Sequence, residues 1–325
     1  MILNCHRFVL VFLLIVFFSV NSFAAAETGR LKSLSLDYSL GYRVDQLDWN
    51  IAGNNGGTTP NVLSELTWSD LQIFQLQLDG RAETKDLLWL KTNTLFLGKL
   101  AGGRIVAGVN QDSDYDGDNR TSEWSRSINQ ADKGFTFDVS GAFGPNYELL
   151  RGRLSVAPLV GYSVHMQDLS MTDGVQTVSD AGHSPTPPLV GPIAGLDSSY
   201  KAYWWGPWFG LNLRMKPVAK LDFELTGEYH IVDYFSEANW NLRSLLAHPV
   251  SFEHDANGTG LVINLKSVYE LDQRWSVIFS GNLQRWQTDS GVDTTYYADG
   301  TRGGTRLNQV NWKSYALMLG LRYQF

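Results

Sequence analysis

The chain has 325 residues, a formal net charge of −7, an isoelectric point near 5.4 and one cysteine. The acidic balance argues against nucleic acid as a partner, and a single cysteine excludes a disulfide framework or a thiolate metal site. A mean hydropathy of −0.18 is low for a membrane protein, but it is expected of a β-barrel, whose strands turn every second residue away from lipid.

The N-terminus has the features of a secretory signal peptide. Arg7 precedes an apolar run at residues 8–20, and the small residues Ala24, Ala25 and Ala26 then offer a cleavage site. The run is short for a membrane-spanning helix, so we expect residues 1–26 to be removed near Ala26. The only cysteine, Cys5, would leave with them, and the mature chain would comprise residues 27–325.

The remaining chain contains repeated segments in which apolar and polar residues alternate, as in a strand with one face in an apolar phase. In the last of them, Tyr315, Leu317, Leu319 and Leu321 share one face, and the chain ends on the aromatic Phe325. The pattern predicts ten strands, at residues 33–48, 61–82, 86–101, 133–144, 153–171, 199–216, 219–237, 258–271, 274–288 and 309–325.

The predicted connections alternate in length. Short ones fall at residues 83–85, 145–152, 217–218 and 272–273, and long ones, rich in Gly, Asn, Asp, Ser and Pro, at 49–60, 102–132, 172–198, 238–257 and 289–308. Short periplasmic turns and long extracellular loops are typical of outer-membrane proteins. The sequence therefore predicts an all-β, transmembrane, antiparallel up-and-down β-barrel of about ten strands in the bacterial outer membrane of a Gram-negative cell.

Charged residues occupy positions of the predicted strands that face away from lipid. A barrel of about ten strands has a narrow interior, so these charges would have to be paired. We expect a mostly plugged barrel whose internal ion pairs hold the wall together, with a role in solute transport as the alternative. The lumen charges predicted in this way are Asp138, Arg214, Glu224, Glu228, Lys266 and Arg322.

One acidic segment satisfies the pattern D-x-[DN]-x-[DN]-G-x₅-E, which wraps oxygen ligands around calcium. Gly117 would permit the bend, while Asn119 departs from the usual aliphatic residue. The alternative is a solvated acidic loop. The candidate calcium ligands are Asp112, Asp114, Asp116, Asp118 and Glu123. Another polar segment, Glu253-His254-Asp255, has no nucleophile or metal partner at a fixed spacing, which favours a polar loop.

Residues 63–70, 110–126 and 321–325 resemble the Protochlamydia outer membrane protein family, a porin-like group allied to the omptins, which share a ten-stranded barrel. Omptins are outer-membrane proteases in which an Asp-x-Asp pair on one rim faces an Asp-x-His pair on the other, with a water between them. Asp112 and Asp114 match the first pair. Asn241 and Arg243 stand where the second pair should be, so the base is missing unless His248 or His254 replaces it.

The family's lipopolysaccharide-binding triplet is also reduced, since Tyr162 is kept but Val164 and Met166 replace charged residues. We therefore predict a non-enzymatic outer-membrane barrel in contact with outer-membrane lipid, with no required cofactor. It would be porin-like, passing small solutes, or would bind an extracellular ligand with its acidic loops. The alternative is an omptin-like protease that uses Asp112 and Asp114 with a displaced histidine, His254.

Overall fold

The computed structural model describes residues 31–85 and 92–325, and it shows thirteen strands in one antiparallel sheet. The predicted signal peptide and the first residues of the predicted third strand lie outside the described residues. The strands are β1 (Leu31–Ile51), β2 (Ser64–Thr84), β3 (Asn93–Gly117), β4 (Thr121–Gln130), β5 (Gly134–Leu149), β6 (Leu154–Ser179), β7 (Gly191–Pro192), β8 (Asp197–Val218), β9 (Leu221–Asn239), β10 (Phe252–Glu270), β11 (Trp275–Thr288), β12 (Gly291–Tyr296) and β13 (Arg302–Gln324).

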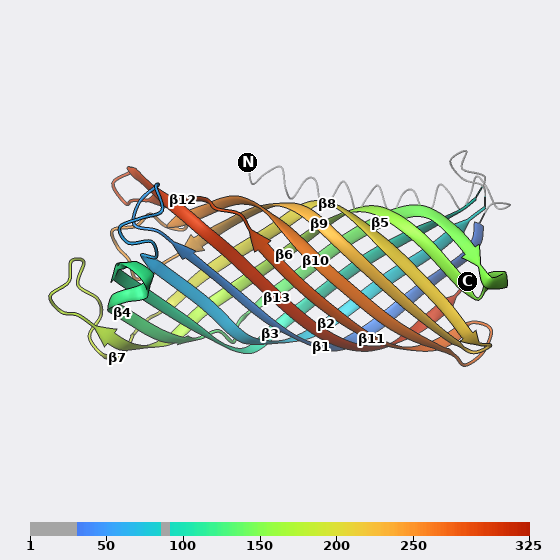
Figure 1. Cartoon of the computed structure of the whole chain (residues 1–325). Helices are drawn as coiled ribbons and strands as arrows, with labels where there is room; N and C mark the ends of the chain where they lie inside the picture. Colours follow the sequence, from blue (N-terminus) through green and yellow to red (C-terminus); the bar gives the residue numbers. More distant parts are fainter. Residues whose placement is uncertain (1–30, 86–91) are drawn as a thin grey trace.

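The sheet closes into a barrel because β1 pairs with both β2 and β13 (Figure 1). Strands β4 and β5 follow one another along the same position between β3 and β6, and β11 and β12 do so between β10 and β13. The two-residue β7 pairs only with β6. The described strands thus occupy ten positions around the ring, and the predicted up-and-down barrel of about ten strands is confirmed.

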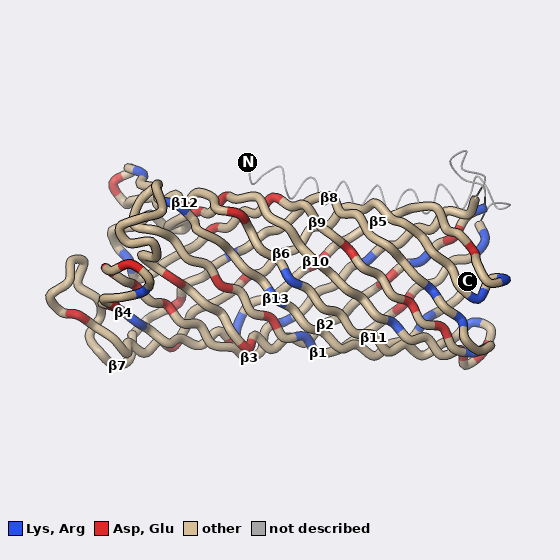
Figure 2. Tube along the Cα trace, viewed as in Figure 1, with Lys and Arg blue, Asp and Glu red and all other residues tan. Residues whose placement is uncertain are grey.

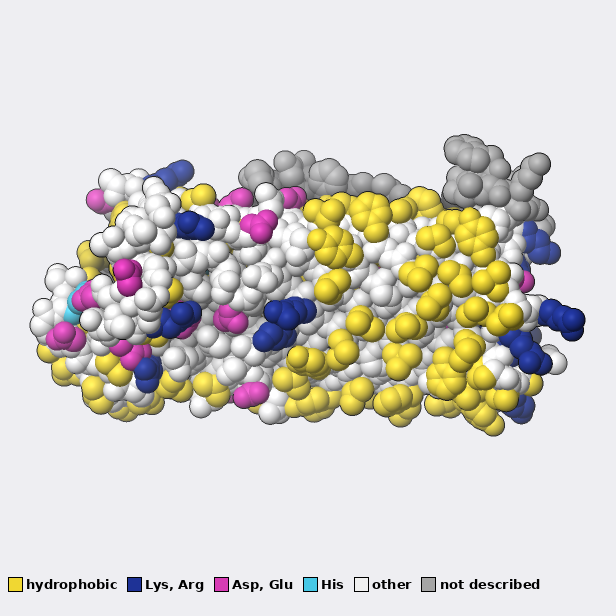
Figure 3. Space-filling view, in the orientation of Figure 1, with side chains coloured by type: hydrophobic (Ala, Val, Ile, Leu, Met, Phe, Trp, Pro, Cys, Tyr) yellow, Lys and Arg dark blue, Asp and Glu magenta, His cyan; other side chains and the backbone are white. Residues whose placement is uncertain are grey.

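The barrel has two halves that differ in the polarity of their outer surface. Apolar side chains form a belt over the half that carries the C-terminus, whereas charged and small polar side chains cover the other half (Figure 3). Within the belt the alternate residues of β13 point outward and are exposed, as the sequence predicted: Tyr315, Leu317, Leu319 and Leu321 are 46% to 61% exposed. Such a band suits the hydrocarbon layer of a membrane.

The strands continue well beyond this belt, and here the predicted loops are wrong in part. Residues 102–132 were expected as one long loop, but β3 continues to Gly117 and β4 returns over Thr121–Gln130. Strand β6 likewise extends to Ser179, and β12 and β13 fill much of residues 289–308. Alternation between apolar and polar faces weakens in these segments because polar residues such as Asn110 and Gln176 stand on the buried face among apolar ones, so the periodicity gave no signal.

The connections at the C-terminal end are short, and those at the other end are long (Figure 1). By the usual topology of outer-membrane barrels, the first end is periplasmic and the second extracellular. We call the belted part the membrane half and the rest the extracellular half. No helix within the described residues is long and apolar enough to cross a membrane.

The larger of the two hydrophobic clusters formed by the described residues lies inside the extracellular half. The smaller one, which includes Leu95, Leu159 and Trp208, lies inside the membrane half. The largest aromatic side chains of the larger cluster that are less than 2% exposed, which we call the aromatic core, are Trp68, Tyr200, Trp204, Tyr234, Trp286 and Trp312. Smaller buried residues from β1, β3, β6 and β10 complete the same cluster: Leu47, Ile105, Leu169 and Ala256 are among them. Strands all around the ring therefore contribute to one packed layer.

Candidate functional site

The candidate calcium segment does not form a binding loop. Asp112, Asp114 and Asp116 lie on strand β3, and only Asp118 is in the turn that joins β3 to β4. Extended backbone holds successive carboxylates along one line instead of wrapping them around an ion. The predicted loop geometry is therefore wrong, because the segment pairs in register with β2 and β4.

Three of the five candidate ligands, Asp116, Asp118 and Glu123, also have separate partners. The Asp116 carboxylate lies 3.1 Å from His183 Nε2, and Asp118 Oδ1 accepts a hydrogen bond from the backbone N–H of Asn61 at 2.7 Å. Glu123 forms an ion pair with Arg126 on β4. Among the described residues, no three carboxylate, histidine or cysteine side chains are grouped so that they could hold a metal ion. Calcium binding by a subset of them stays a prediction.

Asp112 and Asp114 do share one environment, on the interior side of the extracellular half. In the β2 ladder Asp112 stands opposite the buried Leu66, and in the β4 ladder it stands opposite Ser127. Burial, and then the neighbouring Asp114 carboxylate, raise the pKa of Asp112 to about 8, while Arg243 acts in the opposite direction. Ionising both carboxyl groups therefore costs free energy, and a cation bound beside them would lower that cost.

Asp114 lies between two serines in the same ladders, Ser64 on β2 and Ser125 on β4. Burial raises its pKa, whereas hydrogen bonds from the serines and the charges of Arg243 and His183 act against this. Arg243 belongs to the connection after β9, and its positive charge acts on both aspartates. A guanidinium cannot accept a proton at neutral pH.

The histidine proposed as a displaced base lies elsewhere. His254 is on β10 and 0% exposed, with Nδ1 2.9 Å from the Tyr200 hydroxyl and Nε2 3.2 Å from Asp293 Oδ1. His248, the other candidate, has its Nδ1 2.8 Å from Asn239 Oδ1. The alternative grouping of Asp112, Asp114 and His254 gains no support, because the Tyr200 hydroxyl and Asp293 are the partners of the imidazole.

The structure brings His183 to this region, which the sequence did not indicate. Its ring stacks on Trp124 at 3.7 Å between centroids. Desolvation lowers its pKa, but hydrogen bonds to the Pro185 carbonyl and the Asp116 carboxylate outweigh this, so the pKa is raised. His183 and Asp116 are 67 residues apart, in segments both expected to be loops. No local pattern could have paired them.

The predicted lumen charges lie inside the membrane half. Figure 2 shows charged residues of both signs along its strands, while the same face in Figure 3 shows an apolar surface, so these side chains point inward. Arg322 Nε and Nη2 donate to Asp37 at 2.7 and 2.9 Å, and its Nη1 donates to Glu224 at 2.8 Å. Lys266 lies 2.5 Å from Asp37 and 3.0 Å from Asp79.

Ion pairs of this kind extend around the wall, as expected from the sequence. Arg214 pairs with Asp222 at 2.6 Å, Glu228 lies 3.0 Å from His230, and Asp138 binds Arg43 at 2.7 Å. The alternation of β1 could have revealed the partners Asp37 and Arg43, since each faces away from an exposed tyrosine, and Asp79 on β2 follows the half-buried Leu78 in the same way. We call the whole set the lumen charge network.

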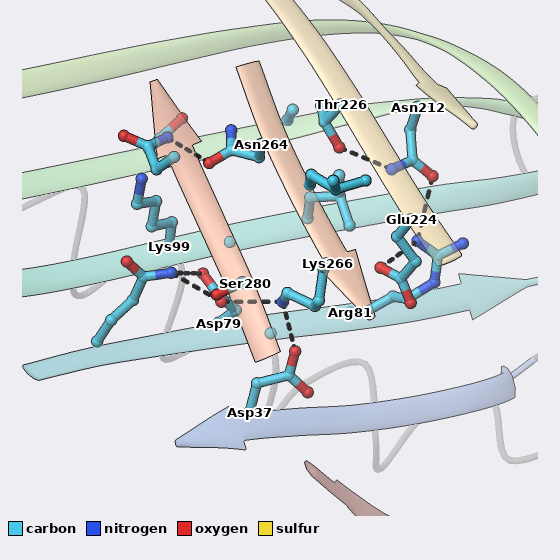
Figure 4. A pocket seen from close by; sticks show the side chains of 18 of the residues that line it. Asp37, Asp79, Arg81, Lys99, Asn212, Glu224, Thr226, Asn264, Lys266 and Ser280 are labelled. Carbon is cyan, nitrogen blue, oxygen red and sulfur yellow. Dashed lines mark hydrogen bonds and ion pairs between the residues drawn. The ribbon is translucent and has the colours of Figure 1, made fainter. Parts of the chain in front are cut away.

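A cavity of about 100 Å³ lies among these charges (Figure 4). Its charged lining is balanced between four acidic and four basic side chains: Asp37, Asp79, Glu224 and Glu228 against Arg81, Lys99, Lys266 and Arg322. Amides on β8 and β10 complete the lining, and Asn212 Oδ1 accepts a hydrogen bond from Arg81 at 3.2 Å. The cavity is small and polar, which suits bound water better than a solute pathway.

The aromatic core separates this cavity from the extracellular end. Trp286 and Trp312 stack with centroids 5.2 Å apart, and Trp204 packs on Tyr234 at 4.4 Å. Trp312 Nε1 donates to Asp45 Oδ2 at 3.0 Å, and Asp45 forms an ion pair with Arg43 at 2.6 Å, so the aromatic core contacts the lumen charge network. A side chain lining a water-filled channel would be exposed to water, and these are not. The interior is closed at this level.

Comparison with solved structures gives several outer-membrane barrels at low similarity. The translocator domain of autotransporter NalP from Neisseria meningitidis is 12% identical, with 94% of this chain and 92% of that chain covered and a TM-score of 0.35. OprG from Pseudomonas aeruginosa is 9% identical, with 91% and 97% covered and a TM-score of 0.29. TM-scores this low support no conclusion about this chain, and the barrel fold follows from the strand pairing described above.

A major outer membrane protein from Thermus thermophilus is similar at 11% identity, with 88% of this chain and 99% of that chain covered and a TM-score of 0.28. No curated protein matches the sequence. The model of one family, described as Protochlamydia outer membrane protein (Pom), matches residues 37–325, which is nearly the whole described barrel. The chain therefore belongs to the Protochlamydia outer membrane protein family and is an outer-membrane β-barrel.

Proposed function

We propose that this barrel is non-enzymatic and non-conducting, and that it acts through its extracellular end as a binding surface. The observation that carries the proposal is the closed layer of the aromatic core, whose six members are at most 1% exposed. An ion crossing the barrel would have to displace several packed indole rings. Each such ring buries a large apolar area, so spontaneous opening is costly.

The extracellular end offers a chemistry for binding. The Asp112 and Asp114 carboxylates face one space, and burial raises the pKa of both. A ligand that brings an ammonium or guanidinium group to this space would relieve the cost of their charge. We therefore infer a ligand with a cationic group, and not a small solute in transit through the lumen.

Planar-bilayer recordings of the refolded protein test the non-conducting state. We expect no conductance steps from the unmodified protein. The double variant Trp204→Ala with Trp286→Ala should give steps, because it removes two rings from the closed layer. Trp205→Ala is the matched control: it changes the next residue of β8, which faces outward, and should stay silent. A heat-dependent shift in electrophoretic mobility verifies that each barrel is folded.

Reproducible steps from the unmodified protein would contradict the proposal and indicate a porin. Equal silence from all three proteins, with folding verified, would contradict the assignment of the barrier to the aromatic core.

A further inference from the structure

Three successive rows of outward-facing residues cross strands β1, β13, β11 and β10 at the extracellular edge of the apolar belt. Cross-strand register defines each row, since its members stand directly opposite one another. The row inside the belt is apolar: Val44, Tyr315, Leu283 and Ile263. The row farthest from the belt is polar: Asp48, Asn311, Gln287 and Thr259. Between them lies a row that contains Gln46, Lys313, Arg285 and Leu261.

The middle row places two cations side by side. Arg285 on β11 stands directly opposite Lys313 on β13. Among the described residues, neither has an ion-pair partner within 4.0 Å. Like charges directly opposite each other destabilise a strand pair, so this arrangement carries a cost that an anion would remove. Asp48 in the polar row interacts with the charge of Lys313 only beyond ion-pair distance, and its carboxylate accepts a hydrogen bond from Asn311 Nδ2 at 2.7 Å.

The two cations also border a depression on the outer surface. Its volume is about 280 Å³, and Gln287, Asn311 and Asp48 line it beside Arg285 and Lys313. Figure 3 shows basic side chains at the edge of the apolar belt over β13. The depression therefore offers two charged donors and further amide donors at the level where hydrocarbon gives way to water.

We propose that Arg285 and Lys313 bind the phosphate group of a lipid headgroup in the outer leaflet. A membrane lipid places its phosphate at this boundary and its acyl chains against the apolar row of Tyr315 and Leu283. Free inorganic phosphate would gain the ionic contacts but not the apolar ones. Guanidinium and ammonium groups together suit a phosphate with several acceptor oxygens.

Titration of the refolded protein in detergent micelles with lipid A, followed by native mass spectrometry, tests the proposal. The unmodified protein should bind lipid A, and its dephosphorylated form should bind weakly. The double variant Arg285→Gln with Lys313→Gln should bind lipid A roughly 25-fold more weakly, because each interfacial cation contributes about 1 kcal/mol. Both substitutions are on the outer surface, so the barrel should fold normally.

Arg104→Gln is the matched control. Arg104 is also exposed on the outer surface, but Phe74 and Phe135 stand opposite it, so it has no second cation beside it in the ladder. This variant should bind lipid A as the unmodified protein does. Unchanged binding by the double variant, or an equal loss in Arg104→Gln, would overturn the proposal. Displacement of lipid A by millimolar inorganic phosphate would overturn the choice of a lipid as the occupant.

Discussion

The two halves of the barrel are built with opposite polarity. In the membrane half most apolar side chains face outward, and the interior holds the lumen charge network beside only a small apolar cluster around Trp208. In the extracellular half the outer surface is polar and the interior holds the aromatic core. The same strands run through both halves, so the exchange occurs within single strands: on β13, Leu317 faces lipid while Trp312, five residues earlier, faces the interior.

The surroundings explain this difference. Within the bilayer, lipid accepts the apolar face and the closed ladders satisfy the backbone, so the interior can be polar if its charges are paired. Beyond the bilayer both sides of the wall would meet water, and the strands need a hydrophobic core of their own, as in a soluble protein. The consequence for function is that the extracellular half is sealed by the core that stabilises it.

The largest effect should follow from removing part of the aromatic core. Trp312→Ala should lower the free energy of unfolding by about 4 kcal/mol, because a fully buried indole is lost and a cavity remains. Trp275→Ala, at the periplasmic edge and 40% exposed, should cost much less. Urea unfolding in detergent micelles measures both, and equal losses would contradict a distinct core in the extracellular half.

Removing a hub of the lumen charge network should come next. Arg322→Ala leaves Asp37 and Glu224 without their shared partner, and should cost about 3 kcal/mol in the same unfolding experiment. Lys216→Ala is the control, since both side chains of its ion pair with Glu270 are 37% exposed and water can replace the contact. If Arg322→Ala were as stable as the unmodified barrel, the network would not be needed to hold the membrane half together.

A smaller effect should appear in the pH dependence of the extracellular half. Asp112 has a folded pKa of about 8 against an ordinary value of 3.8. Between these values the folded state keeps a proton that the unfolded chain has lost, so stability falls as pH rises, by up to about 1.4 kcal/mol per pH unit. Asp112→Asn should reduce the change of the thermal midpoint between pH 5 and pH 8. Asp132→Asn, at an exposed site, should leave this change as it is in the unmodified protein. A wild-type slope in Asp112→Asn would exclude this group as the cause.

The smallest expected effect is that of calcium. We expect it to raise the thermal midpoint slightly, through Asp112 and Asp114 alone. The rise should vanish in Asp112→Asn with Asp114→Asn and persist in Glu123→Gln, because Glu123 pairs with Arg126. Calorimetry with calcium or a chelator measures the shift. If calcium did not raise the thermal midpoint of the unmodified protein, the prediction of calcium binding would be wrong.

The sequence predicted the membrane half better than the extracellular half, for a physical reason. Lipid on one side and a polar lumen on the other impose a strict period of two, as in Leu317, Leu319 and Leu321, so the strands and lumen charges such as Glu224 and Arg322 could be located. The partners of those charges depend on which strands meet across the barrel. Arg322 and Asp37 are 285 residues apart, and only ring closure joins them.

In the extracellular half the segment from Asp112 to Glu123 satisfies every defined position of the calcium-loop pattern. Pairing with β2 and β4 extended it into a strand, because ladder hydrogen bonds satisfy the backbone there. The aromatic core was equally hidden, since Trp204 and Trp286 could each have been placed in an interfacial belt. The resemblance to omptins did indicate that Arg243 would stand across from Asp112 and Asp114, and its charge acts on both carboxylates in the structure.

Cysteine accessibility tests the closure of the barrel most directly, since the chain has only Cys5, which can be changed to serine. A single cysteine at Ser280, which lines the lumen cavity, is exposed to a membrane-impermeant thiol reagent added from the extracellular side of oriented vesicles. A cysteine at Asp299, in an exposed extracellular turn, serves as the reactive control. The structure predicts that the control is modified and the Ser280 position is not; rapid modification of both would contradict a barrel sealed by its aromatic core.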